Sequence, residues 1–378
     1  MELVDLSRRY RNFYAPSFTV RVAGKDLVRD ILVAVSRVEV ELKLGDASLF
    51  TLTLSDCYSH KHHVFETAHG DDLLDILTLG AEVEVCIGYG DAATTPTAIL
   101  GAISNISTSF PETGSPELVV SGYDHGFALT LGTNSFSWQE STDSDVVSQI
   151  ATKHKFNADV EPTTEKHPQI EQHQISDWAF LQKLAQRNSD DDENQFEVYL
   201  DASGQAKRPT LHFGKPRVKS SPVLRLKWGE GLLSFRPEAN LAGQVSKVEV
   251  YSWDVRGKQQ IVGRASADNA GLKSQSIGRH LGALVRAPDR APTMRLRQPS
   301  FTQAEADKRA KAALGEKAKK FLTGDAEAIG LPELRPDRTV LLDNLGKAFS
   351  KPYYIEQASH RIDSGGYRTR FKVRETAL

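Results

Sequence analysis

Thiol and imidazole side chains gather in one short stretch of the sequence. Cys57 opens it, four histidines follow, and a second cysteine, Cys86, lies further along; the histidines are His60, His62, His63 and His69. Thiolates and imidazoles are zinc ligands, so a mixed site is conceivable here. The stretch contains no Cys-x-x-Cys pair, and Cys86 lies in a strand pattern where a small buried residue is expected. The sequence leaves a metal site at this cluster open, and our prediction includes no metal ligand.

Two other polar groups have the composition of a reactive site without its spacing. Residues 121–126 contain serine, aspartate and histidine, but neighbours in sequence rarely form a catalytic triad, and no Gly-x-Ser-x-Gly motif is present. Residues 190–193 are acidic, yet they lack the alternating spacing and the central glycine of a calcium loop. No glycine-rich phosphate loop is present either. We therefore predict no catalytic residues and no cofactor.

Positive charge is concentrated in two places. Residues 255–300 carry nine Lys and Arg against two Asp, and the last expected strand alternates apolar residues with basic ones. The whole chain is close to neutral, with a formal charge of -2, which argues against nucleic-acid specificity and favours contact with an acidic protein partner. The candidate partner-contact residues are Arg286, Arg290, Arg368, Arg370, Lys372 and Arg374.

The composition is that of an ordinary globular protein of more than one domain. The chain has 378 residues, of which 39% are hydrophobic and 25% charged, and a length of this order predicts two or three domains. Two cysteines cannot form a multi-bridge secreted framework, so we expect synthesis in a reducing cytoplasm. No signal peptide and no apolar run of membrane-spanning length is visible, so no membrane anchor is predicted.

Three segments with different patterning position these residues. Residues 1–130 show period-two alternation, as in 38–44, punctuated by Gly and Pro, which predicts a closed or nearly closed antiparallel barrel. Residues 131–220 carry two helix signals, capped at Thr142 and Ser176, and a hairpin, which predicts a small α/β insert.

Residues 221–378 form the third segment, in which strands return. The polar stretch 255–300 is predicted to be a long basic loop. It is followed by a helix over 302–322 with a Thr302–Glu305 capping box, and by two closing strands. The fold class predicted is therefore β-rich α+β, with two antiparallel β-barrel domains flanking an α/β insert.

Motifs in a fixed order along nearly the whole chain carry a resemblance to a known family. The sequence resembles the late control gene D family of phage tail proteins. These are the baseplate hubs of contractile tails and tail-derived injection systems, and they are related to the N-terminal part of type VI secretion valine-glycine-repeat spike proteins. The stretches that carry the resemblance are residues 14–20, 79–85, 88–89, 101–103, 110–111, 122–124, 142–145, 176–181, 184–188, 353–362 and 365–369.

The resemblance implies a structural role in an assembled particle. It implies a homotrimer in which each subunit gives two tube-type β domains, so that three subunits adapt a six-fold inner tube to a three-fold spike. The sequence ends at Leu378, shortly after the second β domain. A separate spike protein is therefore expected as a partner, together with the inner tube protein and other baseplate proteins. The chain is expected to be made in the bacterial cytoplasm and to leave it within a finished tail or injection particle.

The alternative function is a cell-wall or metal-dependent hydrolase carried on the tail. Its support is the group of histidines between His60 and His69. The hub hypothesis predicts no enzymatic activity, so metal content and wall-clearing activity distinguish the two.

Overall fold

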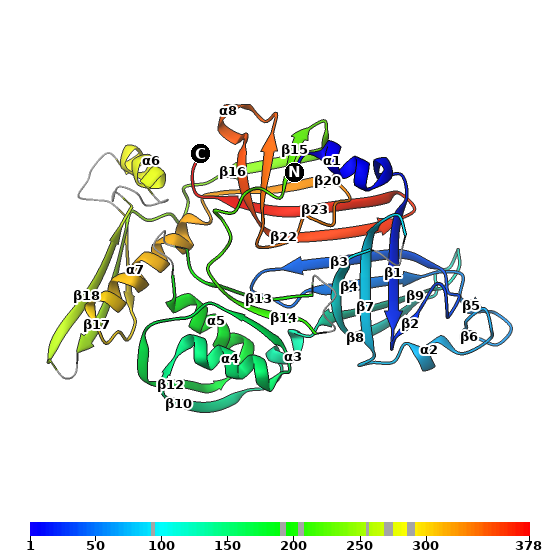
Figure 1. Ribbon diagram of the computed structural model, residues 1–378, viewed down its shortest axis with the longest axis horizontal. Coiled ribbons are helices and arrows are strands. Elements are labelled where there is room, and N and C mark those ends of the chain that lie inside the picture. Colours follow the sequence, from blue (N-terminus) through cyan, green and yellow to red (C-terminus); the bar gives the residue numbers. More distant parts are fainter. Residues whose placement is uncertain (92–94, 190–193, 203–207, 255–256, 268–274, 286–291) are drawn as a thin grey trace.

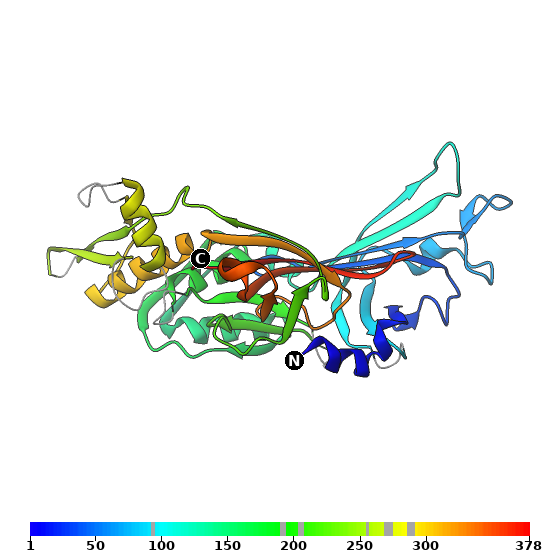
Figure 2. The same ribbon diagram turned by 90° about the horizontal axis from the view of Figure 1, so that it is seen from above.

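A single sheet of 13 strands runs through the computed structural model, which describes all residues except 92–94, 190–193, 203–207, 255–256, 268–274 and 286–291 (Figure 1). The strand order is β2-β1-β7-β8-β9-β4-β3-β22-β21-β15-β16-β20-β23, and β22 also pairs with β23. Within the described residues no helix has the length and apolar character needed to cross a membrane. The molecule is elongated, and the first-half strands of the sheet, coloured blue to cyan, extend to one end of its long axis (Figure 2).

The first half of this sheet is antiparallel throughout. Its core consists of alternating apolar residues such as Val38, Val40 and Leu52, all fully buried. A short N-terminal helix pair, α1 (Leu3–Arg9) and η1 (Arg11–Phe13), precedes it, and β5 (Tyr58–Ser59), β6 (Val64–Phe65), α2 (Leu73–Ile76) and α3 (Phe127–Thr130) lie in its connections. The strands are β1 (Pro16–Val22), β2 (Lys25–Asp26), β3 (Val35–Lys43), β4 (Leu49–Leu54), β7 (Glu82–Tyr89), β8 (Thr97–Ser109) and β9 (Glu117–Asp124).

The second half closes on itself as a six-stranded barrel. The strands are β15 (Leu224–Trp228), β16 (Gly231–Ala239), β20 (Leu322–Ile329), β21 (Thr339–Asp343), β22 (Lys351–Asp363) and β23 (Gly366–Glu375), with α8 (Gly346–Phe349) before β22. The β-rich α+β fold and the two closing strands are thus confirmed. The barrel is not antiparallel throughout, because β15 pairs in parallel with β21 and β16. The chain between β15 and β21 is long enough for the crossover that parallel pairing requires.

The two halves are joined directly through β3 and β22. Residues 38–43 of β3 pair in antiparallel register with residues 357–362 of β22, so Val40 lies opposite His360. On the other edge of β22 the register with β23 brings His360 opposite Thr369. The first and second halves therefore share one continuous sheet at this seam.

The α/β insert forms between the two halves as the sequence indicates. Thr142 caps α4 (Asp143–Lys153) in a capping box with Asp145, and Ser176 caps α5 (Asp177–Arg187). The helices bury Val146, Leu181 and other apolar residues against the strands in a separate core. The strands are β10 (Asn134–Thr142), β11 (Asn157–Val160), β12 (Lys166–Ile175), β13 (Glu197–Asp201) and β14 (Thr210–Gly214).

The predicted long loop over 255–300 is wrong. This part of the chain contains β18 (Gln259–Ser266), α6 (Gln275–Val285) and β19 (Thr293–Arg297), which join β17 (Lys247–Asp254) in the sheet order β18-β17-β19. The helix α7 (Gln303–Ala318), shorter than the predicted 302–322, packs on this sheet. Strands β17, β18 and β19 and helix α7 thus form a lateral subdomain with its own core, at the end of the molecule away from β1 and β7 (Figure 1). Ile277 and Leu281 of α6 are buried in the barrel core instead.

Small residues explain why the lateral subdomain escapes the sequence pattern. A Cβ on Gly263 of β18 would lie 2.1 Å from the backbone of Ala306, so α7 packs directly on the strand. Two of the three buried positions of β18, Gly263 and Ala265, are small, so the strand shows only weak hydrophobic alternation beside Ile261. The domain boundaries at residues 130 and 220 stay a prediction.

Candidate interaction face

The exposed charges of β23 arise from strict alternation along most of the strand. Thr369 and Phe371 point into the barrel and are buried, whereas the side chains of Arg368 and Arg370 are 55% and 69% exposed. Lys372 is the third exposed basic residue of the strand. The predicted division into an apolar inner face and a basic outer face therefore holds from residue 367 to residue 373.

The basic residues of β23 lie between acidic neighbours. Glu327 of β20 is opposite Arg370 in the register, and its carboxylate pairs with Arg368 Nη1 and Arg370 Nε, each at 3.3 Å. On the other side of β22, Glu39 of β3 accepts a hydrogen bond from Ser359 Oγ at 3.2 Å. The face is thus a mixed pattern of both charge signs, and exposed pairs of this kind contribute about 0–1 kcal/mol each to stability.

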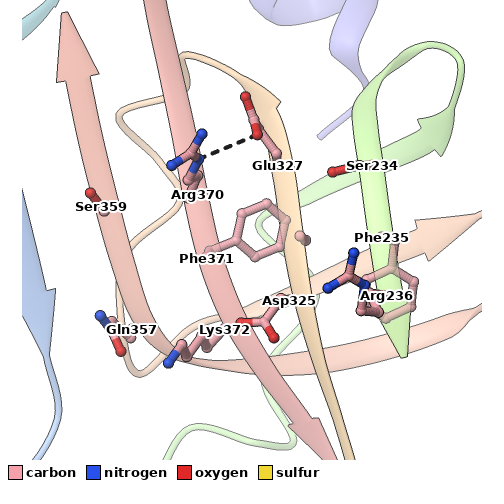
Figure 3. A pocket seen from close by; sticks show the side chains of 11 residues that line it. Ser234, Phe235, Arg236, Asp325, Glu327, Gln357, Ser359, Arg370, Phe371 and Lys372 are labelled. Carbon is pink, nitrogen blue, oxygen red and sulfur yellow. Dashed lines mark hydrogen bonds and ion pairs between the residues drawn. The ribbon is translucent and has the colours of Figure 1, made fainter. Parts of the chain in front are cut away.

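A shallow pocket of about 430 Å³ opens on this face of the barrel (Figure 3). Its lining comes from four strands, β16, β20, β22 and β23, and includes Arg236, Asp325, Glu327, Arg370 and Lys372. A neighbouring hollow of about 340 Å³ continues across the seam to β3, where it is lined by Glu39, Arg361 and Asp363. The two hollows together place charged side chains of both signs along the seam.

Arg374 points out of the barrel as predicted, but it does not belong to the exposed face because the insert covers it. It is 6% exposed, its guanidinium pairs with Glu197 at 2.9 Å and Glu356 at 3.1 Å, and it stacks over Tyr354 at 4.7 Å. Glu197 belongs to β13, so the insert covers the end of β23 and buries an outward-facing residue there. Arg374 therefore links the insert to the barrel through its ion pairs with Glu197 and Glu356.

Glu197 is the centre of this buried cluster. Its carboxylate also accepts a hydrogen bond at 3.2 Å from Nζ of Lys319, the residue that follows α7. Burial acts to raise the pKa of Glu197, but the charges of Lys319 and Arg374 outweigh it and hold the pKa below its usual value. Three parts of the chain, the insert, the barrel and the end of α7, therefore meet at one ionised carboxylate. Arg286 and Arg290 lie outside the described residues.

The histidine stretch is not assembled as a metal site within the described residues. Cys57 and Cys86 are buried and free, and burial raises the pKa of both thiols. His62 Nδ1 pairs with Glu66 at 2.9 Å, and the His60 ring packs edge-on against Tyr58. The described residues do contain a group of three metal-ligating side chains, but it lies elsewhere, at Glu165, His167 and Glu305. Sequence reasoning missed this group because its members are up to 140 positions apart.

The Ser121–Gly126 segment is structural. Asp124 is 7% exposed and accepts hydrogen bonds from the backbone N–H groups of Ser48 and Gly126, both at 2.9 Å. Burial raises the pKa of Asp124 to about 6 against the opposing effect of these hydrogen bonds. The carboxylate closes a turn at the end of β9.

Comparison with known proteins identifies the family. The model of the Alg8 N-terminal domain matches residues 14–364. The chain belongs to the Alg8 N-terminal domain family. No curated protein matches the sequence.

Solved structures share the fold of this family member over nearly its whole length. A tail protein from Neisseria meningitidis has a TM-score of 0.67 at 17% identity, with 96% of this chain and 97% of that chain covered. A 43 kDa tail protein of prophage MuSo2 from Shewanella oneidensis also gives 0.67, at 13% identity, with 95% and 98% covered. An E. coli component of the type VI secretion system gives 0.53 at 12% identity, with 94% and 76% covered. The predicted resemblance to phage tail proteins is therefore confirmed as a shared fold.

Proposed function

We propose that this chain is a structural hub in the baseplate of a contractile tail or tail-like injection system. The observation that carries the proposal is the end-to-end match to two tail proteins, in which at least 95% of each chain is covered. Because nearly all of both aligned chains is matched, the similarity extends over the whole arrangement of domains and is not limited to one common module. The role proposed is mechanical and non-enzymatic.

We further propose that three copies assemble into a ring that adapts a six-fold inner tube to a three-fold spike. Two β units in one chain supply six units in three chains, which is the number that a six-fold tube requires. The β3–β22 pairing supports this arrangement because it holds the two units in one continuous sheet. Symmetric closed rings are the usual outcome for soluble homo-oligomers.

Contacts with other tail proteins are proposed for the face around β23. Its mixed charges, with Arg368 and Arg370 beside Glu327, fit a complementary protein surface better than a polyanion. A structural neighbour in Francisella was solved in a PdpA–VgrG complex, with a TM-score of 0.54, 98% of this chain covered and 54% of that chain. The present chain therefore spans about half the length of that neighbour, and a separate spike protein is the partner proposed here.

Solution mass and particle imaging test the proposal. Light scattering on the purified chain mixed with its spike protein is expected to give three times the 41.7 kDa chain mass plus the spike. Electron microscopy of purified particles is expected to place the chain between tube and spike. A chain that stays monomeric with the spike present, and that is missing from the particles, would contradict the proposal.

A wall-clearing assay tests the non-enzymatic role. The wild-type chain and the double variant His62→Ala/His63→Ala are expected to be equally inactive on purified cell wall. Activity in the wild type that the double variant loses would instead support the hydrolase.

A further inference from the structure

Three metal-ligating side chains converge where the insert meets the lateral subdomain. Glu165 precedes β12, His167 lies on β12, and Glu305 lies in the first turn of α7. One ligand atom from each lies within 4.8 Å of the other two. His167 and Glu305 are both 5% exposed, so two of the three donors are held in the protein interior.

Glu305 is fixed in place by its neighbours. Its carboxylate accepts from the Phe301 backbone N–H at 2.7 Å and from Arg309 Nη2 at 2.6 Å. A carboxylate has about four lone-pair positions, so these two bonds leave room for a further interaction. The side chain is therefore a preorganised ligand, held by the helix that carries it.

The His167 ring forms no hydrogen bond with any residue that the structure describes, and its backbone is paired with Ser141 of β10. The nearest carboxylate oxygen, Asp143 Oδ1, lies 3.9 Å from its Nε2, and Asp143 is itself occupied by Arg187. One ring nitrogen of His167 lies within 4.8 Å of a carboxylate oxygen of each of the two glutamates.

Glu165 is the third donor, and no described cation is paired with it. Arg309 compensates the charge of Glu305, but among the described residues Glu165 forms neither a hydrogen bond nor an ion pair. Two carboxylates at this separation repel each other unless a cation or proton lies between them. The charge balance of the cluster therefore has room for one more cation.

We propose that Glu165, His167 and Glu305 bind a divalent first-row transition metal of the Zn²⁺ class. An imidazole with two carboxylates suits Zn²⁺, whereas Mg²⁺ and Ca²⁺ take oxygen ligands only. With metal–ligand distances of about 2.0–2.2 Å and tetrahedral angles, the donor atoms would lie about 3.4 Å apart, so small side-chain movements complete the site. A water molecule would occupy the fourth coordination position of the metal. The metal joins the insert to α7 and so fixes the lateral subdomain against it.

Zinc binding to the full chain tests the proposal. The chain is stripped with a chelator, and Zn²⁺ binding is followed by competition with a chromophoric chelator and by metal analysis after dialysis. The wild type is expected to bind one Zn²⁺ at the cluster, and Glu165→Gln is expected to weaken that binding at least tenfold. Glu165→Gln is the preferred variant because the residue is half-buried and pairs with no described residue, so metal-free folding should be unchanged by circular dichroism.

The histidine stretch supplies the matched control. The double variant His62→Ala/His63→Ala removes two exposed imidazoles far from the cluster and is expected to leave the Zn²⁺ affinity unchanged. His167→Gln gives a second loss variant, and Co²⁺ loading gives a visible absorption band that should disappear in both loss variants. Equal binding by wild type and Glu165→Gln, or loss of binding only in the His62/His63 variant, would overturn the proposal. The outcome is independent of whether the chain is a hub.

Discussion

Replacement of Arg374 by glutamine should weaken the attachment of the insert to the barrel. The guanidinium pairs with Glu197 and Glu356, and removal of one member of a buried ion pair costs about 3–5 kcal/mol because the partner charge stays buried. Glu197 keeps Lys319 at 3.2 Å, which places the expected loss at the lower end of that range. We therefore expect the free energy of unfolding to fall by about 3 kcal/mol.

Arg370→Gln on the same strand is the matched control. Arg370 is exposed and its pair with Glu327 is solvated, so its loss should cost at most about 1 kcal/mol. Urea unfolding followed by tryptophan fluorescence measures both variants. Hydrogen exchange should also rise in Glu197–Asp201 of β13 for Arg374→Gln alone. If the two variants lost the same stability, the argument that Arg374 fastens the insert would be refuted.

Three further predictions concern the seam, the lateral subdomain and the exposed face. Burial and the nearby Arg335 lower the pKa of His360 from 6.5 to about 3. Below pH 6.5 the imidazole of His360 is therefore protonated in the unfolded chain but stays neutral in the folded chain. The stability that the neutral His360 contributes is therefore complete above pH 6.5 and falls toward pH 3. In thermal melts, the stability difference between wild type and His360→Gln should be about 2 kcal/mol smaller at pH 5 than at pH 7. Gly263→Ala should cost about 1–3 kcal/mol through its clash with α7, whereas Gly282→Ala, with open space around it, should cost nothing in the same urea assay. Charge reversal of Arg368 and Arg370 should weaken assembly roughly tenfold at low salt and less at high salt, and wild-type binding in a salt titration would exclude this face as a contact.

Local signals in the sequence were sufficient to predict the elements whose formation depends on neighbouring residues alone. The caps at Thr142, Ser176 and Thr302 each accept a backbone N–H as predicted, because a cap depends only on residues within one turn. Half of the predicted Thr302–Glu305 capping box is different, since the Glu305 side chain accepts a hydrogen bond from the Phe301 backbone N–H rather than from that of Thr302. The alternation of β23 could likewise be predicted from residue 367 to residue 373, because there the buried side chains are the ones that face inward.

Contacts between distant segments could not be read from the sequence. Arg374 continues the basic alternation of β23, and only the position of β13 makes it buried. The strand β18 was hidden because Gly263 and Ala265 are small enough to lie under α7 and carry little hydrophobic signal. The Glu165–His167–Glu305 cluster depends on how the insert and α7 pack, which no local pattern encodes.

The hydrogen-bonded seam between β3 and β22 has a consequence for a ring of three chains. Such a ring has six joints between β units, and the seam supplies three of them inside single chains, with a register that is set when each chain folds. The other three joints form only when chains associate. The proposed ring would therefore contain two alternating kinds of joint, one formed within a chain and one formed between chains, and dissociation of the ring would break only the second kind.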